Sequence, residues 1–127
     1  RFRIKKQYTR VSKVSAITLD DYVNKGNKPP TIIKFDIEGG EGDAIIGSLG
    51  LIRKYKPRIM MEVWGGEAGK KYSRVAIDKL KELGYKAFLL DSEGGISGKP
   101  LDNPIAAISA GGNDSRDNLL FRLARSM

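Results

Sequence analysis

The 127-residue chain contains neither cysteine nor histidine. The absence of cysteine excludes disulfides, thiolate nucleophiles and thiolate metal sites. The absence of histidine removes the commonest general base and the commonest transition-metal ligand. Acid–base chemistry in this protein must therefore use aspartate, glutamate, lysine or tyrosine side chains.

Long hydrophobic runs are also missing from the sequence. No apolar stretch approaches the roughly 20 residues that cross a bilayer, and the first residues lack the apolar segment of a signal peptide. We therefore expect a soluble, cytoplasmic protein without a membrane partner. The length and the 40% hydrophobic content correspond to one ordinary domain with a single core.

Acidic residues are scarce near the N-terminus, and this segment accounts for most of the formal net charge of +8. Six basic residues precede the first acidic residue, Asp20: Arg1, Arg3, Lys5, Lys6, Arg10 and Lys13. No interleaved aromatic residues and no zinc-finger spacing accompany these charges, which favours a solvated, charged strand pair over a nucleic-acid surface. A nucleic-acid partner is therefore not expected.

The first half of the chain predicts short elements. Loose apolar alternation over residues 2–17 indicates one or two strands. Thr18 is a typical N-cap for a short helix over residues 19–23. The β-branched run 31–37 predicts a strand covered on both faces, as in a parallel sheet. Apolar residues from Ile45 to Ile52 then recur at helical spacing.

The second half predicts a strand over residues 58–64, a flexible loop over 65–69, a helix from about Ser73, and a strand over 85–90. Residues 91–118 are rich in Gly, Asn, Asp and Ser and predict a long irregular loop before a closing strand over 118–123. The alternation of strands and helices predicts an α/β fold with a mostly parallel sheet. Because almost no helix precedes the closing strand, we expect it to be antiparallel.

Carboxylates follow the predicted strands. Asp36 lies at the tip of the first of these strands and is followed by Glu38 and Glu41, and Glu62 and Trp64 lie at the end of the second. Ligands of open α/β sheets bind beyond the carboxyl ends of the strands, so these groups are candidates for one site. Helix-dipole stabilisation is the alternative for Glu38 and Glu41, and plain packing is the alternative for Trp64. Neither alternative explains Asp36 or Glu62.

The turn Gly40-Glu41-Gly42 before a predicted helix is not a dinucleotide fingerprint, because the third glycine is missing and Glu41 would repel a phosphate. A magnesium-dependent hydrolase or nuclease is one alternative function, with Asp36, Glu38 and Glu62 as oxygen ligands. A basic nucleic-acid-binding module is another.

Three separate motifs resemble the signature of FkbM-type methyltransferases. They are ITLDDYV at 17–23, IKFDIEGGE at 33–41 and KPRIMME at 56–62. The later LGYK at 83–86 and DNLLF at 117–121 are also similar to that family's ending. The resemblance spans roughly residues 14–123, and the spacing of the motifs makes it specific.

The resemblance implies the C-terminal half of a Rossmann-like methyltransferase sheet, with residues 1–127 as a single partial domain. It further implies methyl transfer from S-adenosylmethionine to a hydroxyl group of a small molecule or sugar. The family's glycine-rich cofactor loop would lie upstream of residue 1, so we expect the chain alone to be inactive and to bind the cofactor negligibly. We also expect the strand over 31–37 to be a sheet edge that pairs with another copy or with the chain's own N-terminal strands.

Site roles follow from the resemblance as well. Asp36, Glu38 and Glu62 would be the catalytic residues, and Asp36 would also lie beside the methyl end of the cofactor. Glu41 and Trp64 would contact the acceptor. No metal ligands are implied. Many members carry a histidine shortly after the second-strand glutamate, where this chain has Val63-Trp64, so a histidine-assisted mechanism is not expected.

Overall fold

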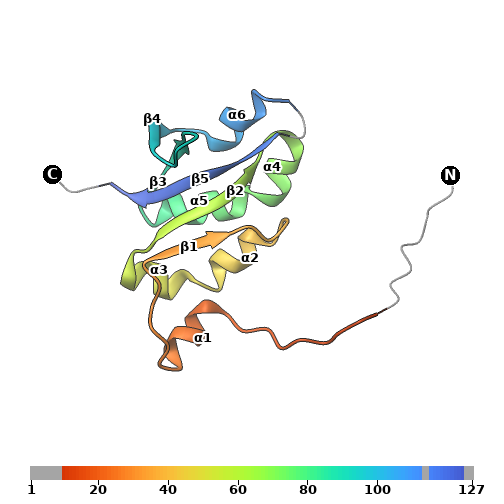
Figure 1. Ribbon diagram of the computed structural model, residues 1–127, viewed down its shortest axis with the longest axis vertical. Helices are drawn as coiled ribbons and strands as arrows, with labels where there is room; N and C mark the ends of the chain where they lie inside the picture. Colours follow the sequence, from red (N-terminus) through yellow and green to blue (C-terminus); the bar gives the residue numbers. More distant parts are fainter. Residues whose placement is uncertain (1–9, 113–114, 125–127) are drawn as a thin grey trace.

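A computed structural model describes residues 10–112 and 115–124 of the chain. Helices and strands alternate along most of this part (Figure 1). In chain order the elements are α1 (Leu19–Asn24), β1 (Ile32–Phe35), α2 (Glu41–Ile46), α3 (Leu49–Tyr55), β2 (Arg58–Trp64), α4 (Gly66–Tyr72), α5 (Arg74–Glu82), β3 (Tyr85–Leu90), β4 (Ile96–Leu101), α6 (Pro104–Ser109) and β5 (Arg116–Leu123).

The strands form one five-stranded mixed sheet in the order β1-β2-β5-β3-β4. β1 and β2 are parallel, with Ile33 opposite Ile59. β5 lies between β2 and β3 and is antiparallel to both. β4 is antiparallel to β3 at the far edge. Because β5 is antiparallel to both β2 and β3, these two strands run in the same direction as each other and as β1. The carboxyl ends of β1, β2 and β3 therefore lie at the same end of the sheet.

Alternating burial along β2 shows which face of the sheet carries the core. Ile59, Met61 and Val63 are fully buried, whereas the residues between them are only half-buried. The buried side chains join one cluster with residues of the helices, such as Ile45 of α2 and Leu80 of α5. Glu62 and Trp64 therefore lie on the face opposite the main core.

Several predictions from the sequence are confirmed. α1 begins after Thr18, whose Oγ1 accepts a hydrogen bond from the backbone N–H of Asp21 at 3.1 Å. β2 and β3 occupy the predicted ranges, and α5 begins directly after Ser73. The closing strand is antiparallel as expected, and β1 is an edge strand. None of the helices in the described residues is long and apolar enough to cross a membrane, and the expectation of a soluble, cytoplasmic protein stays a prediction.

The prediction of a mostly parallel sheet is wrong, because β1–β2 is the only parallel pair among the strands of the described residues. The predicted order of β1, β2 and β3 along the chain is confirmed. The order along the chain does not reveal which strands are neighbours in the sheet, and β5 lies between β2 and β3, which would otherwise be parallel neighbours.

The loop predicted over residues 65–69 is instead the start of α4. A Cβ atom at Gly69 would lie 2.1 Å from the carbonyl oxygen of Trp64. The glycine therefore allows the helix backbone to pack against the end of β2. The glycine content of residues 65–69, which suggested a flexible loop, instead permits close packing of the backbone.

The irregular loop predicted over 91–118 is also wrong, because it contains β4, α6 and the start of β5. Asp91 Oδ1 accepts hydrogen bonds from the N–H groups of Glu93 and Gly95 and closes a tight turn between β3 and β4. Asn103 caps α6 through the N–H of Ala106 at 3.1 Å. The polar residues of this stretch thus form a hairpin turn and a helix cap.

The strands predicted near the N-terminus are not formed within residues 10–18, which contain neither helix nor strand. Val11 and Val14 are 84% and 86% exposed, and this segment runs away from the sheet (Figure 1). The remainder of that prediction, with Phe2, Ile4 and Tyr8, lies outside the described residues.

Candidate functional site

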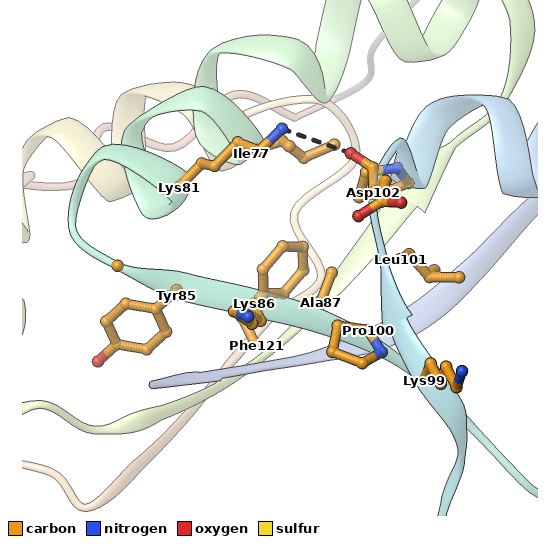
Figure 2. Close-up of a pocket in the computed structure, with 12 residues that line it drawn as sticks. Ile77, Lys81, Tyr85, Lys86, Ala87, Lys99, Pro100, Leu101, Asp102 and Phe121 are labelled. Carbon is orange, nitrogen blue, oxygen red and sulfur yellow. Dashed lines mark hydrogen bonds between the residues drawn. The ribbon is translucent and has the colours of Figure 1, made fainter. Parts of the chain in front are cut away.

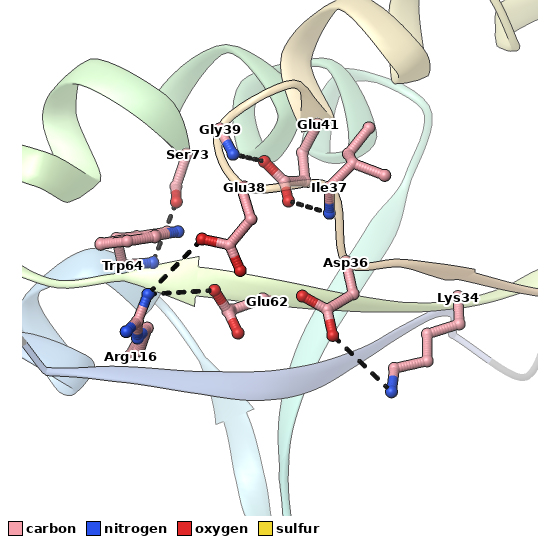
Figure 3. Close-up of polar contacts among 10 residues, drawn as sticks. All are labelled: Lys34, Asp36, Ile37, Glu38, Gly39, Glu41, Glu62, Trp64, Ser73 and Arg116. Carbon is pink, nitrogen blue, oxygen red and sulfur yellow. Dashed lines mark hydrogen bonds and ion pairs between the residues drawn. The ribbon is translucent and has the colours of Figure 1, made fainter. Parts of the chain in front are cut away.

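Asp36, Glu38 and Glu62 come together at the carboxyl ends of β1 and β2 (Figure 3). One carboxylate oxygen from each residue lies within 4.8 Å of those from the other two. Asp36 and Glu38 follow β1, whereas Glu62 lies on β2. Their side chains are 42%, 73% and 15% exposed, respectively. We call these three carboxylates the acidic rim.

A tight turn places Glu38 in the rim. The N–H of Gly40 donates to the carbonyl of Ile37 at 3.3 Å, and the two central residues, Glu38 and Gly39, have φ values of 52° and 101°. A positive φ is unfavourable for glutamate. Such strain persists where surrounding contacts hold the backbone, and functional sites are enriched in it. A Cβ at Gly39 would lie 3.0 Å from Tyr72, so that ring packs directly on the turn.

Glu41 supports this turn from inside the protein. Its side chain is almost fully buried, with 1% of the residue exposed. The two carboxylate oxygens accept hydrogen bonds from the N–H groups of Ile37 and Gly39, both at 3.0 Å. The position therefore gives Glu41 a structural role, and its predicted contact with an acceptor molecule stays a prediction.

Glu62 is the most buried member of the acidic rim. Burial raises the pKa of its carboxyl group above the ordinary value, and the negative charges of Asp36, Glu38 and Glu41 raise it further, while Arg116 opposes the shift. Its Oε1 atom is buried and has no hydrogen-bond partner among the described residues. Glu62 is thus a carboxylate with an increased proton affinity and an unused acceptor atom.

Arg116 is a residue of this site that the sequence reasoning missed. It lies on β5 directly opposite Trp64, and its guanidinium carbon is 4.4 Å from the centre of the indole ring. Its Nη1 atom lies 3.7 Å from Glu38 Oε2 and 4.0 Å from Glu62 Oε1. Arg116 therefore links two carboxylates of the rim (Figure 3).

Trp64 forms one side of the site. Its backbone N–H donates to Ser73 Oγ at 2.9 Å, and its ring lies 5.9 Å from the ring of Tyr72 at an angle of 55°. The indole Nε1 is buried and unpartnered among the described residues. The same holds for Oδ1 of Asn118, which lies opposite Glu62 across the β2–β5 pair. Two further buried polar atoms near the rim therefore lack a hydrogen-bond partner among the described residues.

Sequence signals for Arg116 and Asn118 were weak. Arg116 fell within the predicted loop, and only its pairing with Trp64 brings it to the site. Asp91 and Glu93, which also follow a predicted strand, belong to the β3–β4 turn. Lys34 is paired with Asp36 at 3.9 Å, and both side chains are well exposed.

The chain was also compared with known proteins. Neither the curated proteins nor the solved structures contain a match to it. A family model described as the methyltransferase FkbM domain matches residues 2–87, which is well over half of the chain. This match includes Asp36, Glu38 and Glu62 and agrees with the motifs in the sequence. The chain therefore belongs to the FkbM methyltransferase family.

Proposed function

We propose that this chain forms the acceptor side of an S-adenosylmethionine-dependent methyltransferase that methylates a hydroxyl group of a small molecule or sugar. The observation that carries the proposal is Glu62, a largely buried carboxylate of the rim with a raised pKa and an oxygen that has no hydrogen-bond partner among the described residues. The proposal treats the sheet as the C-terminal half of a Rossmann-like domain.

Glu62 has the properties required of a general base. A hydroxyl group loses its proton as its oxygen attacks a methyl group, and the base must be within hydrogen-bond reach and ionised. Burial and the neighbouring anions strengthen the affinity of Glu62 for that proton. Arg116 opposes the rise and so helps to keep the carboxylate ionised near neutral pH.

The residues of the rim fit the positively charged end of the cofactor that the family uses. S-adenosylmethionine supplies an electrophilic methyl group on a sulfonium sulfur and carries an ammonium group. Asp36, whose carboxylate is 42% exposed, would hold this end through charge complementarity, because its ion pair with Lys34 is long and exposed and therefore weak. The N–H groups of Ile37 and Gly39 are occupied by Glu41 and are not available to the cofactor.

Acceptor recognition is assigned to Glu38, Trp64 and Arg116. Glu38 is 73% exposed and would accept hydrogen bonds from further hydroxyl groups. The Trp64 ring packs against Arg116 and Tyr72 and would offer an aromatic surface to the acceptor. Aromatic rings with a few polar groups are typical of small-molecule sites.

The test uses transfer of a radiolabelled methyl group to a panel of polyhydroxylated acceptors. The chain is assayed by itself and together with a separately produced cofactor-binding segment of another FkbM-family protein. We expect transfer only in the combined sample, and we expect Glu62→Gln to lower the rate by about 10²- to 10⁴-fold. The rate with unmodified chain should rise with pH until Glu62 is ionised.

Asp21→Ala serves as the matched control, because Asp21 is an exposed carboxylate of α1 far from the rim in the fold. It should leave the rate unchanged. Full activity of the Glu62→Gln variant would refute the role of Glu62. Calorimetric titration of the chain alone should show no micromolar binding of S-adenosylmethionine, and micromolar binding would overturn that expectation.

The geometry also bears on the alternative of a magnesium-dependent hydrolase. The three carboxylates are close enough to share a divalent cation. However, the guanidinium group of Arg116 already supplies a positive charge to Glu38 and Glu62, which reduces the need for a metal. Magnesium-dependent cleavage of nucleic acid that is lost on Asp36→Ala would favour the hydrolase instead.

A further inference from the structure

A second concave site lies at the opposite edge of the sheet from the acidic rim. A cavity of about 440 Å³ opens between α5, β3 and β4 (Figure 2). Its volume falls within the roughly 300–1,000 Å³ that small-molecule sites occupy. No part of the acidic rim contributes to its lining, so the proposed methyl-transfer site does not explain it.

A bulge in β4 forms the outer wall of this cavity. Ala87 pairs with Leu101 and Leu89 pairs with Ser97, so one residue of β3 faces three residues of β4. The extra residues include Gly98, which has a φ of 74°, and Pro100, which has no N–H for the ladder. A bulge bends its strand and redirects side chains, and bulges are common beside binding sites.

The floor of the cavity is apolar. Tyr85, Ala87 and Phe121 lie on the core face of β3 and β5 and are at most 4% exposed. The Tyr85 hydroxyl donates to the carbonyl of Pro57 at 2.6 Å, and burial raises the pKa of Tyr85 to about 12. Tyr85 therefore stays neutral and contributes its ring surface. Ile77 of α5 and Leu101 of β4 add aliphatic walls.

Cationic groups surround this apolar floor. Lys81 extends from α5 toward the segment after β4, where its Nζ lies 3.4 Å from the carbonyl of Asp102 (Figure 2). Lys99 stands on the bulge, whereas the exposed Lys86 lies between Tyr85 and Ala87 on β3, so its side chain points to the opposite face of the strand. None of these three lysines forms an ion pair with another described residue. Asp102 is the one acidic residue of the lining among the described residues, so the positive charges of Lys81 and Lys99 exceed the negative charge at the cavity.

We propose that this cavity binds an organic anion with a flat apolar body, such as an aromatic carboxylate. The apolar part would pack on Tyr85, Ala87 and Phe121, and the carboxylate would lie between Lys81 and Lys99. Burying an uncharged ring on an apolar floor stabilises the complex, and the free lysines supply the charge that complements the anion. The inference is independent of the proposed methyl transfer.

Calorimetry and two-dimensional NMR of the whole chain with 2-naphthoate test this proposal. We expect saturable binding, with chemical-shift changes at Ala87, Leu101 and Phe121 and none at Glu62. The double variant Lys81→Met/Lys99→Met keeps the apolar length of both side chains but removes their charge. It should bind 2-naphthoate at least tenfold more weakly and should bind the neutral 2-naphthalenemethanol as the unmodified chain does.

Lys13→Met/Lys28→Met is the matched control, because it removes two exposed charges elsewhere and should leave the affinity unchanged. Circular dichroism melting verifies that each variant folds. Absence of 2-naphthoate binding at millimolar concentration would overturn the proposal. Equal loss of affinity in both double variants, or shift changes centred on the acidic rim, would overturn it as well.

Discussion

At the scale of single residues, Glu41 and Glu62 illustrate how environment assigns a role to a carboxylate. Both are glutamates near the carboxyl ends of neighbouring strands. Glu41 uses both oxygens for backbone N–H groups, whereas Glu62 has a buried oxygen without a partner. The first arrangement stabilises a turn, and the second leaves an acceptor for a ligand.

The raised pKa of Glu62 predicts a pH-dependent cost to stability. The folded protein binds this proton more tightly than the unfolded chain, so the free energy of unfolding falls as the pH rises from the ordinary glutamate pKa through the folded one. Glu62→Gln removes this cost and should stabilise the protein by about 1 kcal/mol at pH 8. Urea unfolding should show that the gain disappears near pH 4. A gain that is equal at both pH values would contradict this assignment.

Glu41→Ala should destabilise the protein by about 3 kcal/mol, because two backbone N–H groups at a buried turn would lose a charged acceptor. The measurement is the midpoint of urea unfolding at constant slope. Asp43→Ala provides the comparison, because Asp43 also lies in the first turn of α2 but makes no side-chain hydrogen bond among the described residues. A similar small loss in both variants would contradict the structural role of Glu41.

At the scale of elements, boundaries depended on contacts that lie far away in the sequence. The helical spacing of Ile45, Leu49 and Ile52 predicts one helix that ends before Pro57, but the structure has α2 and α3 with Gly47 and Ser48 between them. Asp20 of α1 accepts hydrogen bonds from the N–H groups of Gly50 and Leu51. This side chain therefore caps a helix about thirty residues later, an arrangement that local periodicity cannot reveal.

The capping contact gives a prediction for α3. Asp20→Ala leaves two N–H groups of its first turn without a protein acceptor and should lower the free energy of unfolding by about 1 kcal/mol. Asp21→Ala changes the adjacent acidic residue of α1, whose side chain makes no such contact among the described residues, and should cost less. Thermal unfolding followed by circular dichroism compares them. Equal destabilisation would mean that Asp20 acts only through α1.

At the scale of the whole molecule, β1 lies at an edge of the sheet that the described residues form. Ile32 on this strand is 58% exposed, and Ile37 just beyond it is 49% exposed. An exposed apolar edge promotes pairing with another strand. Within residues 10–18 no strand covers it. Association of two copies through β1 thus stays a prediction, as does the assignment of the chain as a single partial domain.

Sedimentation velocity tests this association. We expect the apparent mass to increase with protein concentration, and we expect Ile32→Lys to reduce the increase by placing a charge on the edge. Ile96→Lys is the matched control at the other edge of the sheet, where Ile96 is 39% exposed and the bulge with Pro100 already disfavours pairing. A monomer at every concentration would contradict the prediction.

The sequence by itself determined approximately where β1, β2, β3 and β5 lie along the chain, because burial periodicity and β-branched runs are local properties. It therefore identified Asp36, Glu38 and Glu62 and the family motifs that contain them. Only the tertiary structure decided that β5 inserts beside β2 and brings Arg116 to Trp64 and Asn118 to Glu62. Strand pairing joins residues far apart in the chain, and its register depends on the packing of the whole sheet.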